Sequence, residues 1–308
     1  MSDVEVAVEG RVVRLSSLDR VLWPAAGVTK ADLVDYYARV APVLLPHLAG
    51  RPLTLHRFPE GVGGPHFFQT RTPPHPDWVS TQRMWTFTSG KQVDAPVVGD
   101  LPSLLWAANL STIELHPFLS TGAALDRPTM LVLDLDPGEP AGLVEACRVA
   151  LDVRDLLAGI GLASLAKVSG RKGLHVQVPL APGHTYDETK AVARALAGAL
   201  ARVQPDRVVD RMAKGLRRGR VFVDWSQNDA GKSTVAPYSL RAGTVPTVAL
   251  PVTWEEVHTA VANGDAAGLV FGPGDALARV EELGDLFAPL LAGDQRLTVP
   301  RGARVERP

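Results

Sequence analysis

Several features that mark other protein classes are scarce or missing in this sequence, and each absence narrows the possibilities. The 308 residues include a single cysteine, Cys147, so no disulfide can form within the chain. No stretch approaches the 18 consecutive apolar residues of a membrane span, and the N-terminus lacks the charged-then-apolar layout of a signal peptide. We therefore expect a cytoplasmic protein.

The sequence also lacks internal repeats, heptads and a strong excess of either charge. With 32 basic and 33 acidic residues the net charge is -1, which argues against a general polycation that binds nucleic acid over its whole surface. A local basic patch is nevertheless present in RMAKGLRRGR (211–220). At 46% hydrophobic residues the chain can bury a sizeable core, in one large domain or in two coupled ones.

The spacing of apolar residues in the first third predicts both helices and strands. A helix is expected to begin after the N-cap Thr29 and run through 30–48, and the alternation in RPLTLHRF (51–58) predicts a strand. The Gly- and Pro-rich segment 59–78 is too long for a simple hairpin, which favours a functional loop. The other elements expected here are strands near 83–88 and 91–95 and a helix over 101–115.

From residue 128 onward, expected helices and strands alternate, which predicts an α/β or α+β sheet with helices packed on it. The expected elements are a strand at 129–136, a helix at 140–160, strands at 163–169 and 173–179, a helix at 186–203, the basic segment, and a strand at 220–225.

Three of these strands carry polar residues where core strands rarely have them. In LVLDLDPG (131–138) the two-residue period of a strand places Asp134 and Asp136 on one face. His175 in KGLHVQV and Asp224 in RVFVDW also alternate with apolar neighbours. The three strands therefore offer one polar face on which these side chains can converge.

Converging carboxylates repel one another unless cations lie among them. Hard divalent ions such as Mg²⁺ or Mn²⁺ prefer oxygen ligands, and a pair of them suits phosphoryl or nucleotidyl transfer. In VSGRKGLHV (168–176), Ser169, Gly170 and Gly173 predict a tight turn with exposed backbone N–H groups, and Lys172 adds a charge suited to phosphate. Taken singly, each motif also has an ordinary explanation as a helix cap, a hairpin turn, a structural histidine or a solvated face.

Taken together, these motifs resemble a known family. LVLDLDPG, VSGRKGLHV and VFVDWSQN followed by KSTVAPYSLRA are similar to three sequential motifs of the polymerase domain in bacterial ATP-dependent DNA ligase D, a member of the archaeo-eukaryotic primase superfamily. The similarity extends through LDRVLWPAAGVTKADLVDYYARVAPVLLPHLAGRPLTLHRFPEGV and HFFQ, so it covers nearly the whole chain. It implies an α+β fold in which an RRM-like catalytic sheet packs against an N-terminal α/β subdomain. Residues 1–308 would form one primase-polymerase unit, with DNA and 5′-phosphate contacts in 1–115 and catalysis in 116–300.

The resemblance also implies roles for individual residues. Asp134, Asp136 and Asp224 would be the catalytic metal ligands for two Mn²⁺ or Mg²⁺ ions. The nucleotide-binding residues would be His56, Phe67, Phe68, His116, Ser169, Lys172, His175, Gln227 and Arg241. Among these, His56 and Arg241 would face the triphosphate and the two phenylalanines would stack on bases. Arg20 and Lys30 would hold a DNA 5′-phosphate.

The sequence departs from the family pattern at a few positions. His56 stands where the family has Lys, and a histidine is only partly charged at neutral pH, which weakens the expected triphosphate contact. Arg171 occupies a turn position that is usually small, and Arg20 replaces a Lys. Neither a Lys-x-Asp-Gly ligase motif nor room for a nuclease module is present. We expect a stand-alone polymerase or a domain of a longer protein, with 299–308 as a tail or the start of a linker.

These inferences predict a template-directed nucleotidyltransferase that extends primer 3′-OH groups at gaps and broken DNA ends in non-homologous end joining, with a preference for ribonucleotides. Its expected partners are gapped DNA, NTP or dNTP, a DNA ligase and an end-binding protein, and its expected location is the nucleoid. A haloacid-dehalogenase-type phosphatase also carries Asp-x-Asp at a strand end, but it needs a small hydroxyl residue where this chain has Gly138. A non-catalytic DNA-end-binding module is the other alternative, and it gives no reason for the three acids.

Overall fold

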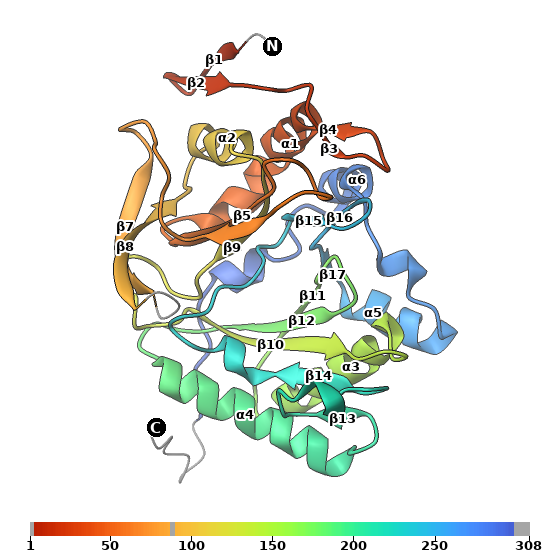
Figure 1. Ribbon diagram of the computed structural model, residues 1–308. Coiled ribbons are helices and arrows are strands. Elements are labelled where there is room, and N and C mark those ends of the chain that lie inside the picture. The colour runs from red at the N-terminus through yellow and green to blue at the C-terminus, as the bar shows by residue number, and fades with distance from the viewer. Residues whose placement is uncertain (1–2, 87–89, 299–308) are drawn as a thin grey trace. The chain divides into compact units, whose positions relative to one another are not determined.

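The computed structural model describes residues 3–86 and 90–298, and the chain divides into two compact units (Figure 1). Unit 1 contains the chain up to Ala123 together with Ser233–Ala249 and Phe271–Asp285, and unit 2 contains the rest. Two late segments therefore belong to the N-terminal unit, whereas the functional division into 1–115 and 116–300 stays a prediction. The mixture of helices and strands confirms the α+β class. None of the described helices has both the length and the apolar character needed to cross a membrane.

The centre of unit 1 is an antiparallel sheet in the order β6-β5-β9. Its strands are β5 (Leu53–Arg57), β6 (Phe67–Gln69) and β9 (Thr112–Pro117), and the helices α1 (Lys30–Leu48) and α2 (Leu101–Asn109) pack on each other beside it. The predicted cap of α1 is confirmed, because the Thr29 hydroxyl accepts the Asp32 N–H and the Asp32 carboxylate accepts the Thr29 N–H in return. The loop predicted over 59–78 contains β6.

The helix predicted over 101–115 is wrong in its second half. α2 ends before Ser111, whose φ of 57° is left-handed and incompatible with a continuing helix. The β-branched residues that follow favour an extended strand, and they form β9 instead. This difference matters because β9 carries Glu114 and His116 on one face.

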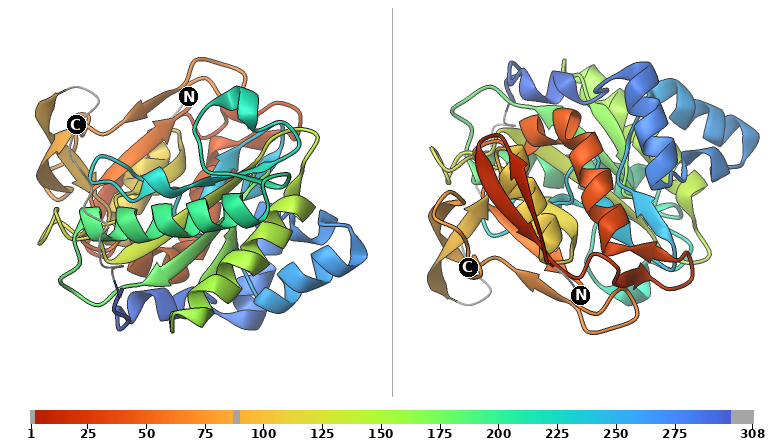
Figure 2. Two further views of the ribbon diagram at one scale, coloured as in Figure 1. Left: turned by 90° about the horizontal axis from the view of Figure 1, so that it is seen from below. Right: turned by 90° about the horizontal axis from the view of Figure 1, so that it is seen from above.

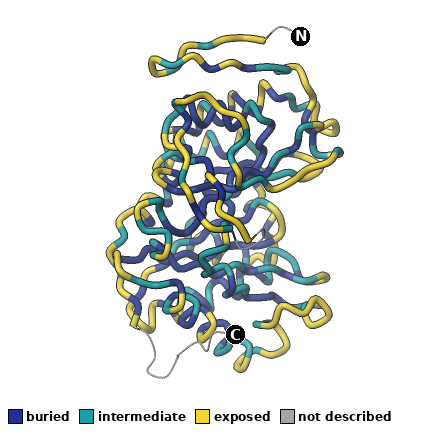
Figure 3. The backbone as a smooth tube through the Cα atoms, turned by 60° about the vertical axis from the view of Figure 1, so that its left-hand side comes forward, coloured by how far each residue is buried: buried dark blue, intermediate teal, exposed yellow. Residues whose placement is uncertain are grey.

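The remaining elements of unit 1 are mostly short. They are β1 (Val4–Val8), β2 (Arg11–Leu15), β3 (Val21–Trp23), β4 (Val28–Thr29), β7 (Ser80–Thr86), β8 (Lys91–Val97), β15 (Leu240–Ala242), β16 (Pro246–Val248) and α6 (Pro273–Leu283). The β1–β2 hairpin, next to the N label in Figure 3, is largely exposed. The strand predicted at 83–88 corresponds to β7 as far as Thr86. Residues 87–88 and the predicted tail or linker at 299–308 lie outside the described residues.

Unit 2 is built on a sheet in the order β13-β14-β10-β12-β11-β17. Its strands are β10 (Met130–Pro137), β11 (Leu165–Val168), β12 (Leu174–Pro179), β13 (Val208–Val209), β14 (Val221–Asp224) and β17 (Pro251–Val252). The helical elements are α3 (Leu143–Gly159), α4 (Tyr186–Val203), α5 (Trp254–Asn263), η1 (Lys214–Leu216), η2 (Trp225–Gln227), η3 (Ala267–Leu269) and η4 (Ala288–Leu291). Helices α3 and α4 lie side by side along the sheet (Figure 2).

Apolar and polar residues alternate along the central strands, and burial of the apolar ones stabilises this sheet. Leu133, Leu135, Val176 and Val223 are fully buried, and each such side chain stabilises the fold by about 1.5–3 kcal/mol relative to exposure. The helices α3 and α4 contact β10, and α3 also contacts β12, so they cover this apolar face. The polar residues between these positions must therefore point to the other face of the sheet.

Candidate active site

Acidic side chains lie on that other face of the unit 2 sheet. Asp134 and Asp136 are two residues apart on β10, and Asp224 at the end of β14 is the direct antiparallel partner of Asp134. Directly opposed side chains have Cβ atoms about 4.5–5.5 Å apart. On the other side of Asp134 lies His175 of β12, whose Nε2 is 3.3 Å from Asp134 Oδ1. The strand register thus brings these predicted residues together.

The carboxylate of Asp224 is oriented by the turn that follows it. Its Oδ1 accepts hydrogen bonds from the backbone N–H of Ser226 at 2.9 Å and from the Ser226 hydroxyl at 2.6 Å. Its Oδ2 accepts one from the side-chain amide of Gln227 at 3.1 Å. Gln227, which the resemblance places near the triphosphate, therefore contacts one of the predicted metal ligands here.

The turn between β11 and β12 is organised by a hydroxyl. Ser169 Oγ accepts the backbone N–H groups of Arg171 at 3.3 Å and of Gly173 at 3.2 Å. The prediction that the Gly173 N–H is exposed is therefore wrong. A Cβ at Gly173 would lie 2.4 Å from the Leu135 carbonyl oxygen, so the turn packs tightly on β10. Lys172 is exposed and, with Arg171, lines a pocket of about 380 Å³ at the start of α3.

Asn228 is a residue of this face that sequence reasoning missed. It is fully buried, and its side chain pairs with the backbone of Val132 on β10: Val132 N–H donates to Asn228 Oδ1 at 2.9 Å, and Asn228 Nδ2 donates to the Val132 oxygen at 2.6 Å. It ends the quoted motif VFVDWSQN, which was the available signal. The side chain continues the β14–β10 pairing beyond Asp224 and fixes β10 just before Asp134.

In unit 1 a buried carboxylate joins three predicted nucleotide-binding residues. Glu114 Oε2 lies 3.0 Å from His56 Nδ1, 3.0 Å from His116 Nε2 and 3.3 Å from Arg241 Nη1, while Oε1 accepts the Ala242 N–H at 3.0 Å. Burial alone would raise the pKa of Glu114, but the two imidazoles and the Arg241 cation hold it well below its ordinary value. Burial, with Arg241 nearby, lowers the pKa of His116 to about 4 although Glu114 opposes the shift. Sequence reasoning missed Glu114 because it assigned this segment to a helix.

The two predicted base-stacking residues are exposed on β6. Phe67 has 45% and Phe68 60% of its surface accessible, which is unusual for phenylalanine and leaves ring area available to a ligand. Phe68 stacks on the imidazole of His56, with ring centroids 3.8 Å apart. The Nε2 atom of His56 lies 3.0 Å from Nδ1 of His66, another residue that sequence reasoning did not single out.

Arg20 and Lys30 are brought together by the pairing of β3 with β4. The Lys30 N–H donates to the Arg20 carbonyl oxygen at 2.8 Å, so the loop between them folds back as expected. The Lys30 ammonium donates to the Ser16 oxygen at 2.7 Å and is nearly buried, and the exposed Arg20 guanidinium donates to the Pro59 oxygen. Burial, and then the cations of Arg20 and Arg57, lower the pKa of Lys30 to about 8.

Within residues 3–86 and 90–298, two sets of side chains have the chemistry of metal ligands. The three carboxylates of unit 2 are the hard oxygen donors that Mg²⁺ and Mn²⁺ prefer, so they fit such ions. In unit 1, His56, Glu114 and His116 have ligand atoms within 4.8 Å of one another, a donor set that suits Zn²⁺ better. The Arg241 cation beside the same Glu114 oxygen opposes a metal ion there, so the unit 2 carboxylates fit better.

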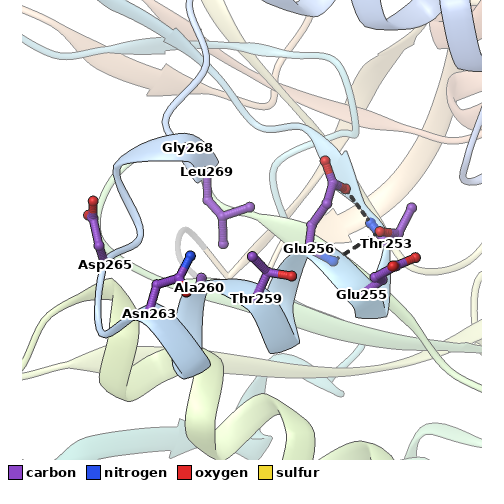
Figure 4. Close-up of a pocket in the computed structure, with 9 residues that line it drawn as sticks. All are labelled: Thr253, Glu255, Glu256, Thr259, Ala260, Asn263, Asp265, Gly268 and Leu269. Carbon is purple, nitrogen blue, oxygen red and sulfur yellow. Dashed lines mark hydrogen bonds between the residues drawn. The ribbon is translucent and has the colours of Figure 1, made fainter.

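The pocket drawn in Figure 4 contains none of the predicted site residues. It has a volume of about 440 Å³ and lies against α5, η3 and the turn between them. The carboxylate of Glu256 in this pocket caps α5, because its Oε2 accepts the Thr253 N–H at 2.8 Å. The pocket therefore adds nothing to the site.

Comparisons with known proteins agree on one family. The model of the LigD primase-polymerase domain matches residues 29–287. The multifunctional non-homologous end joining protein LigD of Mycolicibacterium smegmatis is 40% identical over 281 residues, which are 90% of this chain and 36% of that protein. The bifunctional LigD of Bacillus subtilis is 32% identical over 253 residues, which are 81% of this chain and 40% of that protein. The chain thus spans well under half the length of these relatives.

A solved structure gives the same result for the fold. The polymerase domain of Mycobacterium tuberculosis ligase D, in complex with DNA, is 39% identical and superposes with a TM-score of 0.84. The match covers 92% of this chain and 99% of that domain. The structural match and the sequence matches point to the same family, so neither supports the alternative of a haloacid-dehalogenase-type phosphatase. The chain therefore belongs to the LigD primase-polymerase domain family, a family of nucleotidyltransferases.

Proposed function

We propose that this chain extends primer 3′-OH ends at gaps and broken DNA ends under the direction of a template, as part of non-homologous end joining. The relatives' names and the DNA in the related structure support this proposal. The observation that carries it is the register that sets Asp134 opposite Asp224, with Asp136 on the same face.

The family is metal-dependent, and Asp134, Asp136 and Asp224 would hold two Mn²⁺ or Mg²⁺ ions. When bound, such ions lower the pKa of the attacking 3′-hydroxyl and neutralise the charge of the departing pyrophosphate. The chain's own contribution is to present these carboxylates from adjacent strands, with Asp224 oriented by Ser226 and Gln227. His175, whose Nε2 lies 3.3 Å from Asp134 Oδ1, would hold that carboxylate in place.

The nucleotide would be bound by the residues that the family resemblance names in each unit, each set considered by itself. In unit 2, Ser169, Lys172, His175 and Gln227 would line the nucleotide pocket, and in unit 1, His56 and Arg241 would contact the triphosphate. His116 would lie near the sugar, and a ribonucleotide preference would follow if it binds the 2′-OH. The exposed rings of Phe67 and Phe68 would stack on bases, a contact worth about 1–3 kcal/mol per base.

Residues 1–115 would also contact DNA, with Arg20 and Lys30 holding a 5′-phosphate beside the start of α1. Residues 116–300 would form the catalytic part. A DNA ligase that seals the filled gap and a protein that binds broken ends would be its partners, and the nucleoid its location.

Primer extension tests this proposal directly. A labelled primer on a template is incubated with NTP or dNTP and Mn²⁺ or Mg²⁺. The expected result is extension by the unaltered protein, more efficient with NTP, and none by Asp134→Asn with Asp136→Asn, while DNA affinity is kept. Glu145→Gln, which removes a carboxylate that caps α3, is the control and should stay active.

Two outcomes would contradict the proposal. Substantial extension by the double variant would exclude the metal-ligand role of these acids. DNA binding by the unaltered protein without any lengthening of the primer would favour the non-catalytic end-binding module instead.

A further inference from the structure

Glu114 is the buried centre of a hydrogen-bond network in unit 1, and no predicted role includes it. It lies on β9, directly opposite His56 of β5, and His56 lies opposite Phe68 of β6, so the three form a row across the sheet. His116, two residues further along β9, shares its face with Glu114. The Glu114 side chain is only 1% exposed.

The carboxylate decides which nitrogens of its neighbours carry hydrogen. An ionised carboxylate can only accept hydrogen bonds. His56 Nδ1 and His116 Nε2, each 3.0 Å from Oε2, must therefore both be N–H donors. A neutral His116 then keeps its lone pair on Nδ1, which can accept a hydrogen bond and cannot donate one.

The same carboxylate also orients the cation of Arg241. Arg241 Nη1 is 3.3 Å from Oε2, and the next residue, Ala242, donates its backbone N–H to Oε1 at 3.0 Å. Glu114 thus holds β15 by a hydrogen bond from the Ala242 backbone, and it orients the Arg241 side chain by an ion pair. A single buried acid orients three side chains that come from three different strands.

We propose that Glu114 is a positioning residue for nucleotide binding, which sets the tautomer of His116 so that its Nδ1 accepts the ribose 2′-OH, and which holds Arg241 toward the triphosphate. This inference rests on the proposed function for the nucleotide contacts. A deoxynucleotide lacks the hydroxyl that donates to His116, so it would leave Nδ1 without a partner.

Glu114→Gln tests the inference, because it keeps the volume and removes the charge. The expected result is a KM for NTP about 10- to 100-fold higher, from the loss of one to two well-formed polar contacts, with kcat within about threefold. The ratio of NTP to dNTP efficiency should fall toward one. A purely structural role would instead lower the melting temperature and leave both the KM and this ratio unchanged, which would overturn the proposal.

Asp285→Asn is a matched control from the same unit. Asp285 forms a partly buried pair with His47, with 2.9 Å between Oδ2 and Nε2, and lies outside the proposed binding residues. This variant should lose stability and keep the wild-type KM and NTP preference. An equal rise in KM in both variants would mean that general loosening of unit 1, and not positioning by Glu114, causes the effect.

A readout without catalysis separates this inference from the proposed function. Nitrogen-15 NMR of the imidazoles in the nucleotide-free protein at pH 7 should show His116 neutral with its hydrogen on Nε2, and a mixture of tautomers in Glu114→Gln. The opposite tautomer in the unaltered protein overturns the inference even if Glu114→Gln does not fold. Stoichiometric binding of added Zn²⁺ that depends on Glu114 would also overturn it, since the acid would then be a metal ligand. If the unaltered protein fails to extend primers, the proposed function fails while the tautomer result still stands.

Discussion

The paired cations Arg20 and Lys30 give the most quantitative prediction. A hydrogen bond from the Lys30 N–H to the Arg20 carbonyl oxygen makes the two residues neighbours. The Lys30 ammonium is nearly buried, and this burial, followed by the Arg20 charge, lowers its pKa to about 8. The two like charges repel each other in the free protein. A bound anion relieves this repulsion and is attracted by both cations, which increases its affinity. A terminal 5′-phosphate carries a charge of about -1.5 to -2 at pH 7, more than an internal phosphodiester, and is the anion this arrangement favours.

The magnitude follows from the number and kind of contacts. A hydrogen bond to a charged group contributes about 1.5–3 kcal/mol, and the low end applies here because Arg20 is exposed and screened by solvent. Two such contacts amount to about 3 kcal/mol, or a preference of roughly 100-fold for the phosphorylated end. Arg20→Ala combined with Lys30→Met should abolish this preference, and methionine retains most of the buried stem volume.

The preference should also depend on pH. Lys30 loses its charge in the free protein as the pH rises through about 8, so affinity for the 5′-phosphate should decline above that pH. The bound phosphate raises the pKa of the ammonium again, so the decline should be gradual and accompanied by proton uptake on binding.

The assay compares the affinity for two gapped duplexes that differ only in a downstream 5′-phosphate or 5′-OH, at one salt concentration. Arg39→Ala, which removes an exposed cation of α1, is the control and should keep the full preference. A preference that survives the double substitution would refute the reasoning and direct attention to the basic segment 211–220.

Other predictions concern the residues that support the two sites. Asn228→Ala leaves the buried N–H and oxygen of Val132 without partners at about 1–3 kcal/mol each, so chemical denaturation should show a loss of about 3 kcal/mol; an unchanged midpoint would contradict this. Gly173→Ala places a Cβ 2.4 Å from the Leu135 oxygen, so the melting temperature and primer extension should both fall, and wild-type values would show that the turn can move. The imidazole of His116 should titrate near pH 4, which NMR can follow. Because its folded pKa lies below the unfolded value of 6.5, its contribution to stability is lost as the pH falls from about 6.5 to 4, and a midpoint above 6 would exclude the described burial.

Local signals in the sequence were sufficient for the long helices and for the polar face of unit 2. The Thr29 cap and the apolar spacing after it predicted α1 within its observed bounds, and α4 also formed as predicted. The two-residue alternation placed Asp134 and Asp136 on one face, because side-chain direction along a strand is a local property. The partner of Asp134 could not be derived in this way, since strand register depends on residues far apart in the sequence.

The parts that sequence analysis missed are those set by distant contacts. After residue 225 the strands have only two or three residues, too short for a periodic pattern to identify. The helices α5 and α6 in the same part were also not predicted, although α5 begins with a local signal, the capping box of Thr253 and Glu256. Glu114 was missed because the apolar run that begins α2 continues into β9, and only Leu110 and the left-handed Ser111 separate the two. The role of Glu114 as the common partner of residues from β5, β9 and β15 becomes visible only once these strands are assembled.

The discontinuous path of the chain sets an order for its folding during synthesis. Domains generally fold N-terminal first as they leave the ribosome, but unit 1 is not complete until Asp285 has been made. Before Leu240 is made, the hydroxyl of Tyr37, buried in α1, lacks the Leu240 N–H that it accepts at 3.2 Å in the finished protein. The core of unit 1 therefore stays incomplete during the translation of Ala124–Lys232, because the later segments that complete it have not yet been made. A fragment that stops before Ser233 should be prone to aggregation for the same reason.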